Sequence, residues 1–551
     1  AGDGSAILDF GSRALVQGEP DASSFPSGGI RNTFEARGYT AWDPTSFVFV
    51  RDKTLYIPTA FCGPSGVALD QKTPLLRSME AVSNEAVRVL RLLGWKNVSR
   101  VTPMVGAEQE YFLVDRERYE QRLDLKLCGR TLLGAPPPKS QELDDHYFGR
   151  VRLRIASFMH ELDETLWKLG GAAKTKHNEV APTQHELATV YDSANLTCDA
   201  NHLVMETMKV VAKKHGLACL LHEKPFYGVN GSGKHNNYSL CTDQGKNLLS
   251  PGEHPENNLT FILFLAAFVR GVDRSAPQLR MSTATPGNDC RLGGYEAPPA
   301  IISMFLGERY TSLLAKCSNE DHGSGKRPVS IGVETMPAVL SDDADRNRTS
   351  PFAFTGNKFE FRMVGSAQSI ALANIVLNAL VAESLSFFAA RLEQSTEIER
   401  TVREIACETY AAHGRIIMNG NNYSQEWQIE AARRGLPVYP DSLSAAAVWQ
   451  MPETIDLFGR FHIFSELECH SRYEIMLENY CKVVNIEALT MVDMARREII
   501  PAVSRYVKSL AETAVLMKEA VAAADSSVEC ELVAKLSALN SSALAKIKKL
   551  E

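Results

Sequence analysis

The sequence lacks the patterns that mark several common protein classes. Its 11 cysteines form no C-x-x-C pair, and a chain of this size needs no disulfide framework, so they are expected to be structural thiols in a reducing compartment. No long basic block accompanies the net charge of −7, which argues against nucleic acid or an anionic membrane as the main partner. The chain also begins without methionine, so it is expected to be processed or a fragment, with any targeting peptide outside it.

Long apolar runs are scarce as well. The most apolar run, residues 369–390, is long enough to span a bilayer, but Asn374, Asn378 and Glu383 interrupt it. We therefore expect a buried core helix at this position and no membrane partner.

The composition is that of an ordinary globular protein, 44% hydrophobic and 23% charged, and 551 residues are more than one core usually holds. Extended pieces dominate the first 65 or so residues, strand and helix patterns then alternate, and helical patterns follow from residue 367. The predicted class is α+β. The predicted domains are an N-terminal β-containing domain over residues 1–100, a larger domain over residues 101–490 and a C-terminal helical tail over residues 491–551.

One glycine-rich stretch comes close to a phosphate-binding P-loop. Gly228 to Lys234 reads G-x-x-x-x-G-K, but the next residue is His235, where a P-loop has Ser or Thr at the start of a helix. The residues that follow alternate as a strand does and place Asn237 and Ser239 on the same side as His235. The stretch therefore predicts a turn that presents a histidine and polar side chains to a metal and a small polar substrate.

Carboxylates recur in pairs. Glu108 and Glu110 alternate on one face of an apparent strand, and two buried carboxylates about 4 Å apart repel by roughly 4 kcal/mol at an effective dielectric near 20. A cation between them would remove this cost, although a solvated strand face would also explain the segment. Glu179 and Glu186 lie seven residues apart across a Pro-containing turn, which an exposed loop would explain equally.

The segment NKFEFRM has a cleaner pattern. Lys358, Glu360 and Arg362 point one way and three apolar side chains the other, which predicts a strand that lines a cleft. Together the segments offer a set of oxygen ligands with one nitrogen, which suits two Mg²⁺ or Mn²⁺ ions better than zinc. Such ion pairs clamp polyphosphates for phosphoryl transfer. The proposed ligands are Glu108, Glu110, Glu179, Glu186, His235 and Glu360.

Arginines would complete a site for anionic substrates. The candidates are Arg291, Arg346, Arg348 and Arg362. Any one of them taken alone is more often a surface residue.

These motifs, in this order, resemble glutamine synthetase, and more closely its type III branch. The shared motifs are EQEYFLVD, NEVAPTQHE, KPFYGVNGSGKHNN, GYEAPPA, RNRTSPF and KFEFR. The type III blocks are GEPDASSFPSGGIRNTFEARGYTAWDPTS, KTPLLRSMEA, LLGAPPPKSQELDDHYFG and NKFEFRMVGSAQSIALAN. The resemblance covers nearly the whole chain.

The resemblance implies ATP-dependent ligation of ammonium to the γ-carboxylate of glutamate, through γ-glutamyl phosphate, in nitrogen metabolism. It implies that Glu110, Glu179 and Glu186 bind the first metal. The ligands of the second metal are then Glu108, His235 and Glu360. Asn230 and Gly231 would hold the amino-acid group of glutamate.

The remaining assignments also follow from the resemblance alone. Arg291 and Arg362 would contact the glutamate carboxylate and the transferred phosphoryl group, and Arg348 would stabilise the phosphate. Glu296 resembles the flap carboxylate that accepts a proton from ammonium, and Asp43 the aspartate that binds ammonium across a subunit boundary. The residues expected near ATP are Tyr191, Ser239 and Lys358.

Some positions depart from the family pattern. Asn237 stands where type I enzymes have a histidine that contacts ATP. The Arg348 assignment depends on the R-N-R-T match alone. The chain also begins partway through the type III N-terminal region.

The implied fold is a partial β-grasp-like domain followed by a catalytic domain whose curved antiparallel sheet is backed by helices. The implied assembly is a homo-oligomer, a dodecamer of two stacked hexameric rings, located in the cytoplasm or in an organelle. Two alternatives remain, a γ-glutamyl ligase of the same superfamily that uses a larger amine and an inactive structural relative.

Overall fold

The computed structural model describes most of the chain. The described residues are 39–63, 65–135, 140–141, 146–171, 173–294, 297–316, 328–329, 339–340 and 347–551. Glu296 and Arg346, two candidates from the sequence, lie outside them.

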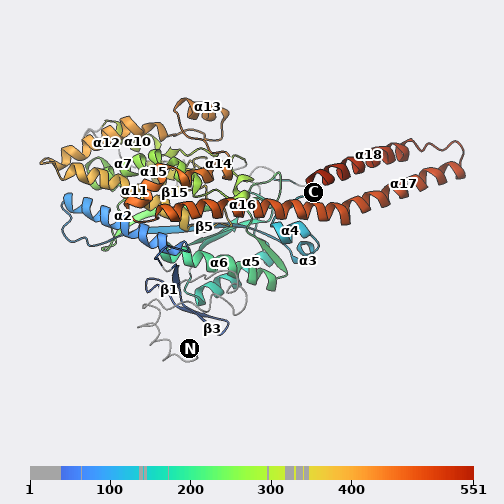
Figure 1. Ribbon diagram of the computed structural model, residues 1–551, viewed down its shortest axis with the longest axis horizontal. Coiled ribbons are helices and arrows are strands. Elements are labelled where there is room, and N and C mark those ends of the chain that lie inside the picture. The colour runs from blue at the N-terminus through green and yellow to red at the C-terminus, as the bar shows by residue number, and fades with distance from the viewer. Residues whose placement is uncertain are drawn as a thin grey trace.

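A nine-stranded sheet forms the centre of the molecule (Figure 1). Its main path runs in the order β11-β14-β15-β10-β5-β7-β6, and β8 and β9 pair with β5. Every pair is antiparallel except β11 and β14, which are parallel. The strands are β5 (Val101–Asp115), β6 (Ala173–Asn178), β7 (Gln184–Thr189), β8 (Asp192–Ser193), β9 (Leu217–Leu220), β10 (Lys234–Thr242), β11 (Met304–Phe305), β14 (Phe352–Phe354) and β15 (Phe359–Phe361).

The two faces of the sheet differ in character because side chains alternate along each strand. On β5, Val105 and Ala107 join the main hydrophobic core, and Tyr111 joins a second one. Glu108 and Glu110 alternate with these residues and therefore lie on the opposite face. The sheet thus has a helix-covered face and a polar face.

Helices from distant parts of the sequence cover the apolar face. Residues of α2, α7 and α11 pack in the main core with β5 and β10, and residues of α5 and α6 form the second core with Tyr111. Gly94 ends the segment after α2 with φ +90°, a conformation that glycine adopts without strain. These helices are α2 (Lys72–Leu92), α5 (Leu153–Lys168), α6 (Ala194–Lys214), α7 (Leu259–Arg274) and α11 (Ala371–Leu392).

Helix α11 is the apolar run identified in the sequence. By length and composition it could cross a membrane, but 78% of its most apolar window is buried inside the protein. Its two asparagines explain the polar interruptions, because Asn374 donates to the Asn236 side chain (3.0 Å) and Asn378 accepts from the Tyr238 hydroxyl (2.7 Å). The segment is the buried core helix that we predicted.

The described part of the N-terminal region is built from short strands. They form two antiparallel pairs, β1 (Tyr39–Trp42) with β4 (Thr59–Cys62) and β2 (Phe49–Arg51) with β3 (Thr54–Tyr56). A β-grasp-like domain remains a prediction, as do the domain boundaries. A further short pair is β12 (Pro328–Val329) with β13 (Val339–Leu340).

The C-terminal part is helical, as the sequence indicated. The remaining helices are α3 (Arg116–Glu120), α4 (Leu123–Cys128), α8 (Ala276–Met281), α9 (Pro286–Asp289), α10 (Gly307–Lys316), α12 (Ile398–His413), α13 (Gln425–Arg433), α14 (Ser442–Ala446), α15 (Pro452–Arg460), α16 (Glu466–Met494), α17 (Ile500–Ala520) and α18 (Ser527–Leu550). A π-helical turn, Ala495–Ile499, joins α16 to α17. Helices α17 and α18 form a hairpin that projects from the body of the molecule (Figure 1).

The cysteines differ in one respect from the expectation. Cys407 on α12 is disulfide-bonded, whereas nine cysteines among the described residues are free thiols.

Candidate active site

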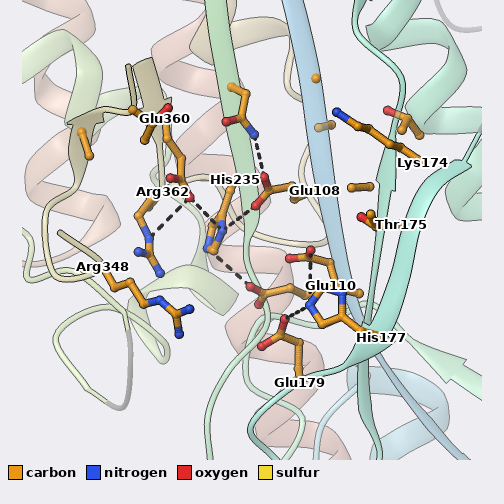
Figure 2. Close-up of a pocket in the computed structure, with 18 of the residues that line it drawn as sticks. Glu108, Glu110, Lys174, Thr175, His177, Glu179, His235, Arg348, Glu360 and Arg362 are labelled. Atoms are coloured by element: carbon orange, nitrogen blue, oxygen red, sulfur yellow. Dashed lines mark hydrogen bonds and ion pairs between the residues drawn. The ribbon is translucent and has the colours of Figure 1, made fainter. Parts of the chain in front are cut away.

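The polar face of the sheet holds a cavity of about 320 Å³. Residues from β5, β10, β15 and the β6–β7 hairpin line it, and Figure 2 shows their side chains pointing toward one another. Thirteen of the sequence candidates line this one cavity: Glu108, Glu110, Glu179, Glu186, Tyr191, Asn230, Gly231, His235, Arg291, Arg348, Lys358, Glu360 and Arg362.

Strand pairing brings together the ligands expected for the second metal. His235 on β10 lies opposite Glu108 on β5, and Glu360 on β15 pairs with Asn237 on β10. The His235 Nδ1 atom lies 3.1 Å from Glu108 Oε2 and 3.3 Å from Glu360 Oε1. Asn237 donates to Glu108 Oε1 at 2.8 Å and so fixes that carboxylate from the same side.

The ligands expected for the first metal meet at the adjoining strand. Glu110 pairs directly with Glu186 on β7, and Glu179 follows β6. The backbone N–H of Gly233 donates to Glu110 Oε2 at 2.6 Å, and His235 Nε2 lies 3.4 Å from Glu110 Oε1. The two predicted ligand sets therefore form one continuous cluster.

A histidine that the sequence analysis missed belongs to this cluster. His177 Nε2 lies 3.0 Å from Glu179 Oε1 and 3.7 Å from Glu186 Oε1 (Figure 2). The strand period could have revealed it, because Thr175, His177 and Glu179 alternate, and all three line the cavity. Lys174 also lines the cavity and was missed.

The cluster concentrates negative charge in a largely buried place. Burial, followed by the charges of Glu108 and Glu179, raises the pKa of the Glu186 carboxyl well above its ordinary value. Burial also raises the pKa of Glu179, against the hydrogen bond from His177. For Glu108, burial acts in the same direction, but the hydrogen bond and charge of His235 outweigh it and lower the pKa to about 2.

The donor set fits divalent cations. Glu108, Glu186 and His235 each offer a ligand atom within 4.8 Å of the others, and His177, Glu179 and Glu186 do the same. Carboxylate oxygens with few nitrogens are what Mg²⁺ and Mn²⁺ bind, and a cation would remove the repulsion that raises the Glu186 pKa.

Three arginines face these acids. Arg291 is 3% exposed; its guanidinium donates to Asn288 Oδ1 (3.1 Å) and to the carbonyl of Arg362 (3.0 Å). The Arg362 Nε atom lies 3.9 Å from Glu360 Oε1 and has no hydrogen-bond partner in the part of the chain described. Arg348 points into the cavity from the loop before β14 (Figure 2).

The glycine-rich turn forms another wall. Gly231 leaves no room for a side chain, because a Cβ atom there would lie 2.5 Å from the Glu223 carbonyl oxygen and 3.0 Å from Arg291 Cγ. Asn230 is held through its backbone N–H and its side-chain oxygen, both 2.9 Å from the Gln141 amide. The lysine of the turn, Lys234, points to the helix-covered face and bonds Asn201 of α6 (2.8 Å), so it cannot act as a P-loop lysine does.

The candidates for ATP binding are partly brought together. Tyr191 and Lys358 line the cavity and contact each other, with the ammonium 4.9 Å from the ring centre. Gly106 lies under the Tyr191 ring, where a Cβ atom would approach to 2.9 Å. Ser239 is buried and is not among the described residues that line the cavity.

Asp43 is not among the described lining residues either. Its carboxylate accepts hydrogen bonds from Thr45 N (2.9 Å), Thr45 Oγ1 (2.6 Å) and Asn195 Nδ2 (2.7 Å), and it forms an ion pair with Lys72 (2.9 Å). Burial opposes ionisation, but these bonds outweigh it and lower the pKa of Asp43. Asp43 is thus a fixed, charged group outside the cavity of its own chain.

Comparison with known proteins agrees with this geometry. The chain matches the family profiles "Glutamine synthetase type III N terminal" over residues 1–78, "Glutamine synthetase, catalytic domain" over residues 84–303 and "Glutamine synthetase C-terminal domain" over residues 401–518. It is 49% identical to "Type-3 glutamine synthetase" of Dictyostelium discoideum, over 93% of this chain and 71% of that one. It is 46% identical to "Glutamine synthetase" of Bacteroides fragilis, over 94% of this chain and 72% of that one.

A solved structure has the same fold at low sequence identity. "GmaS/ADP complex-Conformation 1" superposes with a TM-score of 0.54 at 15% identity, over 87% of this chain and 89% of that one. With the profile matches and the extended identity to the Dictyostelium and Bacteroides proteins, the conclusion is that this chain belongs to the glutamine synthetase family, type III branch.

Proposed function

We propose that this chain is a glutamine synthetase that joins ammonium to the γ-carboxylate of glutamate with hydrolysis of ATP to ADP and phosphate, through γ-glutamyl phosphate. The observation that carries the proposal is the cavity in which six predicted metal ligands face three arginines in a chain of this family. A larger amine as substrate and an inactive relative are not favoured, because the family relatives are glutamine synthetases and all six ligands line the cavity.

The metal ligands divide into two sets. Two Mg²⁺ or Mn²⁺ ions bound there would neutralise phosphate oxygens of ATP and polarise the phosphoryl group for transfer. The chain's part is to hold the carboxylates in place: Asn237 and Gly233 donate to the ligand carboxylates of Glu108 and Glu110. The first set is Glu110, Glu179 and Glu186 and the second is Glu108, His235 and Glu360.

The arginines serve the anionic substrates. Arg291 and Arg362 are assigned to the glutamate carboxylate and the transferred phosphoryl group, and Arg348 to the phosphate. Both arginines are buried and the Arg291 guanidinium is held by the Arg362 carbonyl, so little reorganisation of Arg291 is needed when an anion arrives. Asn230 and Gly231 hold the amino-acid end of glutamate, and Tyr191, Ser239 and Lys358 are assigned to ATP.

Two acids are assigned to ammonium. Asp43 would contribute to the ammonium site of a neighbouring subunit, and Glu296 would accept the proton that ammonium loses before it attacks the acyl phosphate. The role of Asp43 requires a homo-oligomer, and the role of Glu296 requires a closed flap. We propose that the assembly consists of stacked hexameric rings and is located in the cytoplasm or an organelle.

The experiment that tests the function compares nucleophiles. ATP hydrolysis coupled to product formation is measured with ammonium, with methylamine and with water alone. Ammonium should give glutamine at the highest kcat/KM; a higher value with methylamine would support the larger-amine ligase instead. If no nucleophile supports turnover with Mg²⁺ or Mn²⁺, the chain is an inactive relative.

A second experiment separates the roles of the acids. Glu296→Ala should still form γ-glutamyl phosphate, so positional isotope exchange in labelled ATP should persist without ammonium. Glutamine formation should fall by roughly 10²- to 10⁴-fold, the usual cost of losing a general base. Loss of exchange together with glutamine formation would place Glu296 in phosphoryl transfer.

A further inference from the structure

A buried carboxylate, Glu223, lies behind the cavity and is not among its described lining residues. It is 3% exposed and lies in the loop between β9 and β10. Neither the metal assignment nor the substrate assignment uses it. A buried acid carries a desolvation cost, so its contacts should explain why it is there.

Glu223 contacts three loops at once. Its carbonyl oxygen accepts from Ser232 N at 2.8 Å, and its carboxylate accepts from Ala367 N at 3.2 Å. The carboxylate oxygens also lie directly on the backbones of Gly287 and Gly365, since a Cβ atom on either glycine would overlap them.

Each of these loops supplies a residue assigned to glutamate or the phosphoryl group. The loop at Ser232 carries Asn230 and Gly231. Gly287 lies in the short helix α9, which ends two residues before Arg291, and Arg362 follows β15 and lies three residues before Gly365. Glu223 is therefore the point at which the substrate-binding loops meet, on the side away from the substrate.

The same contacts reach the groups that hold the Arg291 guanidinium. This guanidinium donates to Asn288 Oδ1 (3.1 Å) and to the Arg362 carbonyl (3.0 Å), and Asn288 follows Gly287 directly. Glu223 therefore supports Arg291 through the backbone at Gly287 and through the segment from Arg362 to Gly365.

We propose that Glu223 is a positioning residue that fixes the segments of Asn230, Arg291 and Arg362. The inference rests on the proposed function, because it takes these groups to be the glutamate site. It differs from that function in assigning glutamate affinity to a residue that does not touch glutamate.

The first test replaces one carboxylate oxygen by an amide group that cannot accept a hydrogen bond, and keeps the shape. Glu223→Gln should raise the KM for glutamate by roughly 10- to 100-fold, the usual cost of losing a partner that orients a binding group. The KM for ATP should rise less than the KM for glutamate, because Tyr191, Ser239 and Lys358, the residues assigned to ATP itself, lie outside these segments. Glu383→Ala is the matched control: it removes a carboxylate paired with Arg270 in the helix layer and should leave both KM values unchanged.

The second test uses the contact with Gly287. In Gly287→Ala the new methyl group must displace the carboxylate, so the KM for glutamate should rise. Shortening the acid by one methylene in Gly287→Ala/Glu223→Asp makes room again, and the double variant should bind glutamate more tightly than Gly287→Ala alone. A general loss of stability would not produce this rescue.

Glutamate binding by calorimetry, with Mg²⁺ and ADP present, measures the same effect without turnover. It separates failure of this inference from failure of the proposed function, which appears as a wild-type chain that makes no glutamine. A folded Glu223→Gln protein with wild-type glutamate affinity would overturn the inference. Equal losses of affinity for glutamate and ATP, or an absence of rescue, would also overturn it.

Discussion

Replacing Glu186 by glutamine should stabilise the metal-free protein while it removes metal binding. Glu186 is buried beside Glu108 and Glu179, and burial followed by these charges raises its pKa. The unfolded chain has no such penalty, so ionisation of Glu186 favours unfolding. Glutamine has nearly the same shape and cannot ionise.

The size of the effect can be worked out in two ways. At 4.8 Å, the largest separation of the ligand atoms of Glu108 and Glu186, two unit charges repel by roughly 3 kcal/mol at an effective dielectric near 20, and by more when they are closer. If Glu186 instead stays protonated at pH 7, forgoing ionisation at its ordinary pKa of 4.5 costs about 3 kcal/mol. Because the folded chain can always take this protonated form, the second route sets the upper limit.

The sign of the pH dependence follows from the raised pKa. The folded state binds more protons than the unfolded state above pH 4.5, so the wild-type free energy of unfolding falls as pH rises through that value. The advantage of Glu186→Gln should therefore be under about 1 kcal/mol at pH 5 and rise toward the upper limit of about 3 kcal/mol by pH 7.

Denaturant unfolding in excess chelator, at fixed protein concentration and at pH 5, 6 and 7, measures this difference. Glu383→Gln is the control, since it breaks the pairing with Arg270 and should destabilise at every pH. With Mg²⁺ the order should reverse, because the wild type keeps every ligand of the first metal set and gains more binding energy than the variant. The reasoning is refuted if Glu186→Gln is less stable than wild type in chelator, or if its gain is the same at pH 5 and pH 7.

Three further predictions concern activity. Glu360→Ala should lower Mg²⁺-dependent glutamine formation by roughly 10²-fold or more, measured as a function of Mg²⁺ concentration. The control Glu383→Ala should keep the wild-type rate. Full wild-type turnover in excess chelator would contradict the metal requirement. Mixing inactive Asp43→Ala subunits with inactive Glu360→Ala subunits should restore some activity if Asp43 acts in a neighbour's site, and verified mixed oligomers without recovery would count against it. Gly106→Ala should raise the KM for ATP several-fold because its methyl group would meet the Tyr191 ring at 2.9 Å, and an equal rise in the KM for glutamate would argue for a general distortion.

Local periodicity in the sequence was enough to predict the strands and their polar faces. The alternation of Glu108 with Glu110, of His235 with Asn237 and of Glu360 with its neighbours needs only the two-residue period of a strand. The same reasoning identified α11 as a core helix, since its asparagines interrupt the apolar pattern at positions that bond the sheet.

Only the tertiary structure decided which of these faces meet. The register that places His235 opposite Glu108, and Glu110 opposite Glu186, depends on pairing between strands that are far apart in the sequence. His177 joins the cluster through the β6–β7 pairing, and Glu223 matters because the distant segments at Gly287 and Gly365 close around it. Such contacts arise from packing between segments, so a linear pattern can indicate the strand face on which a residue such as His177 lies but not the residues that it meets there.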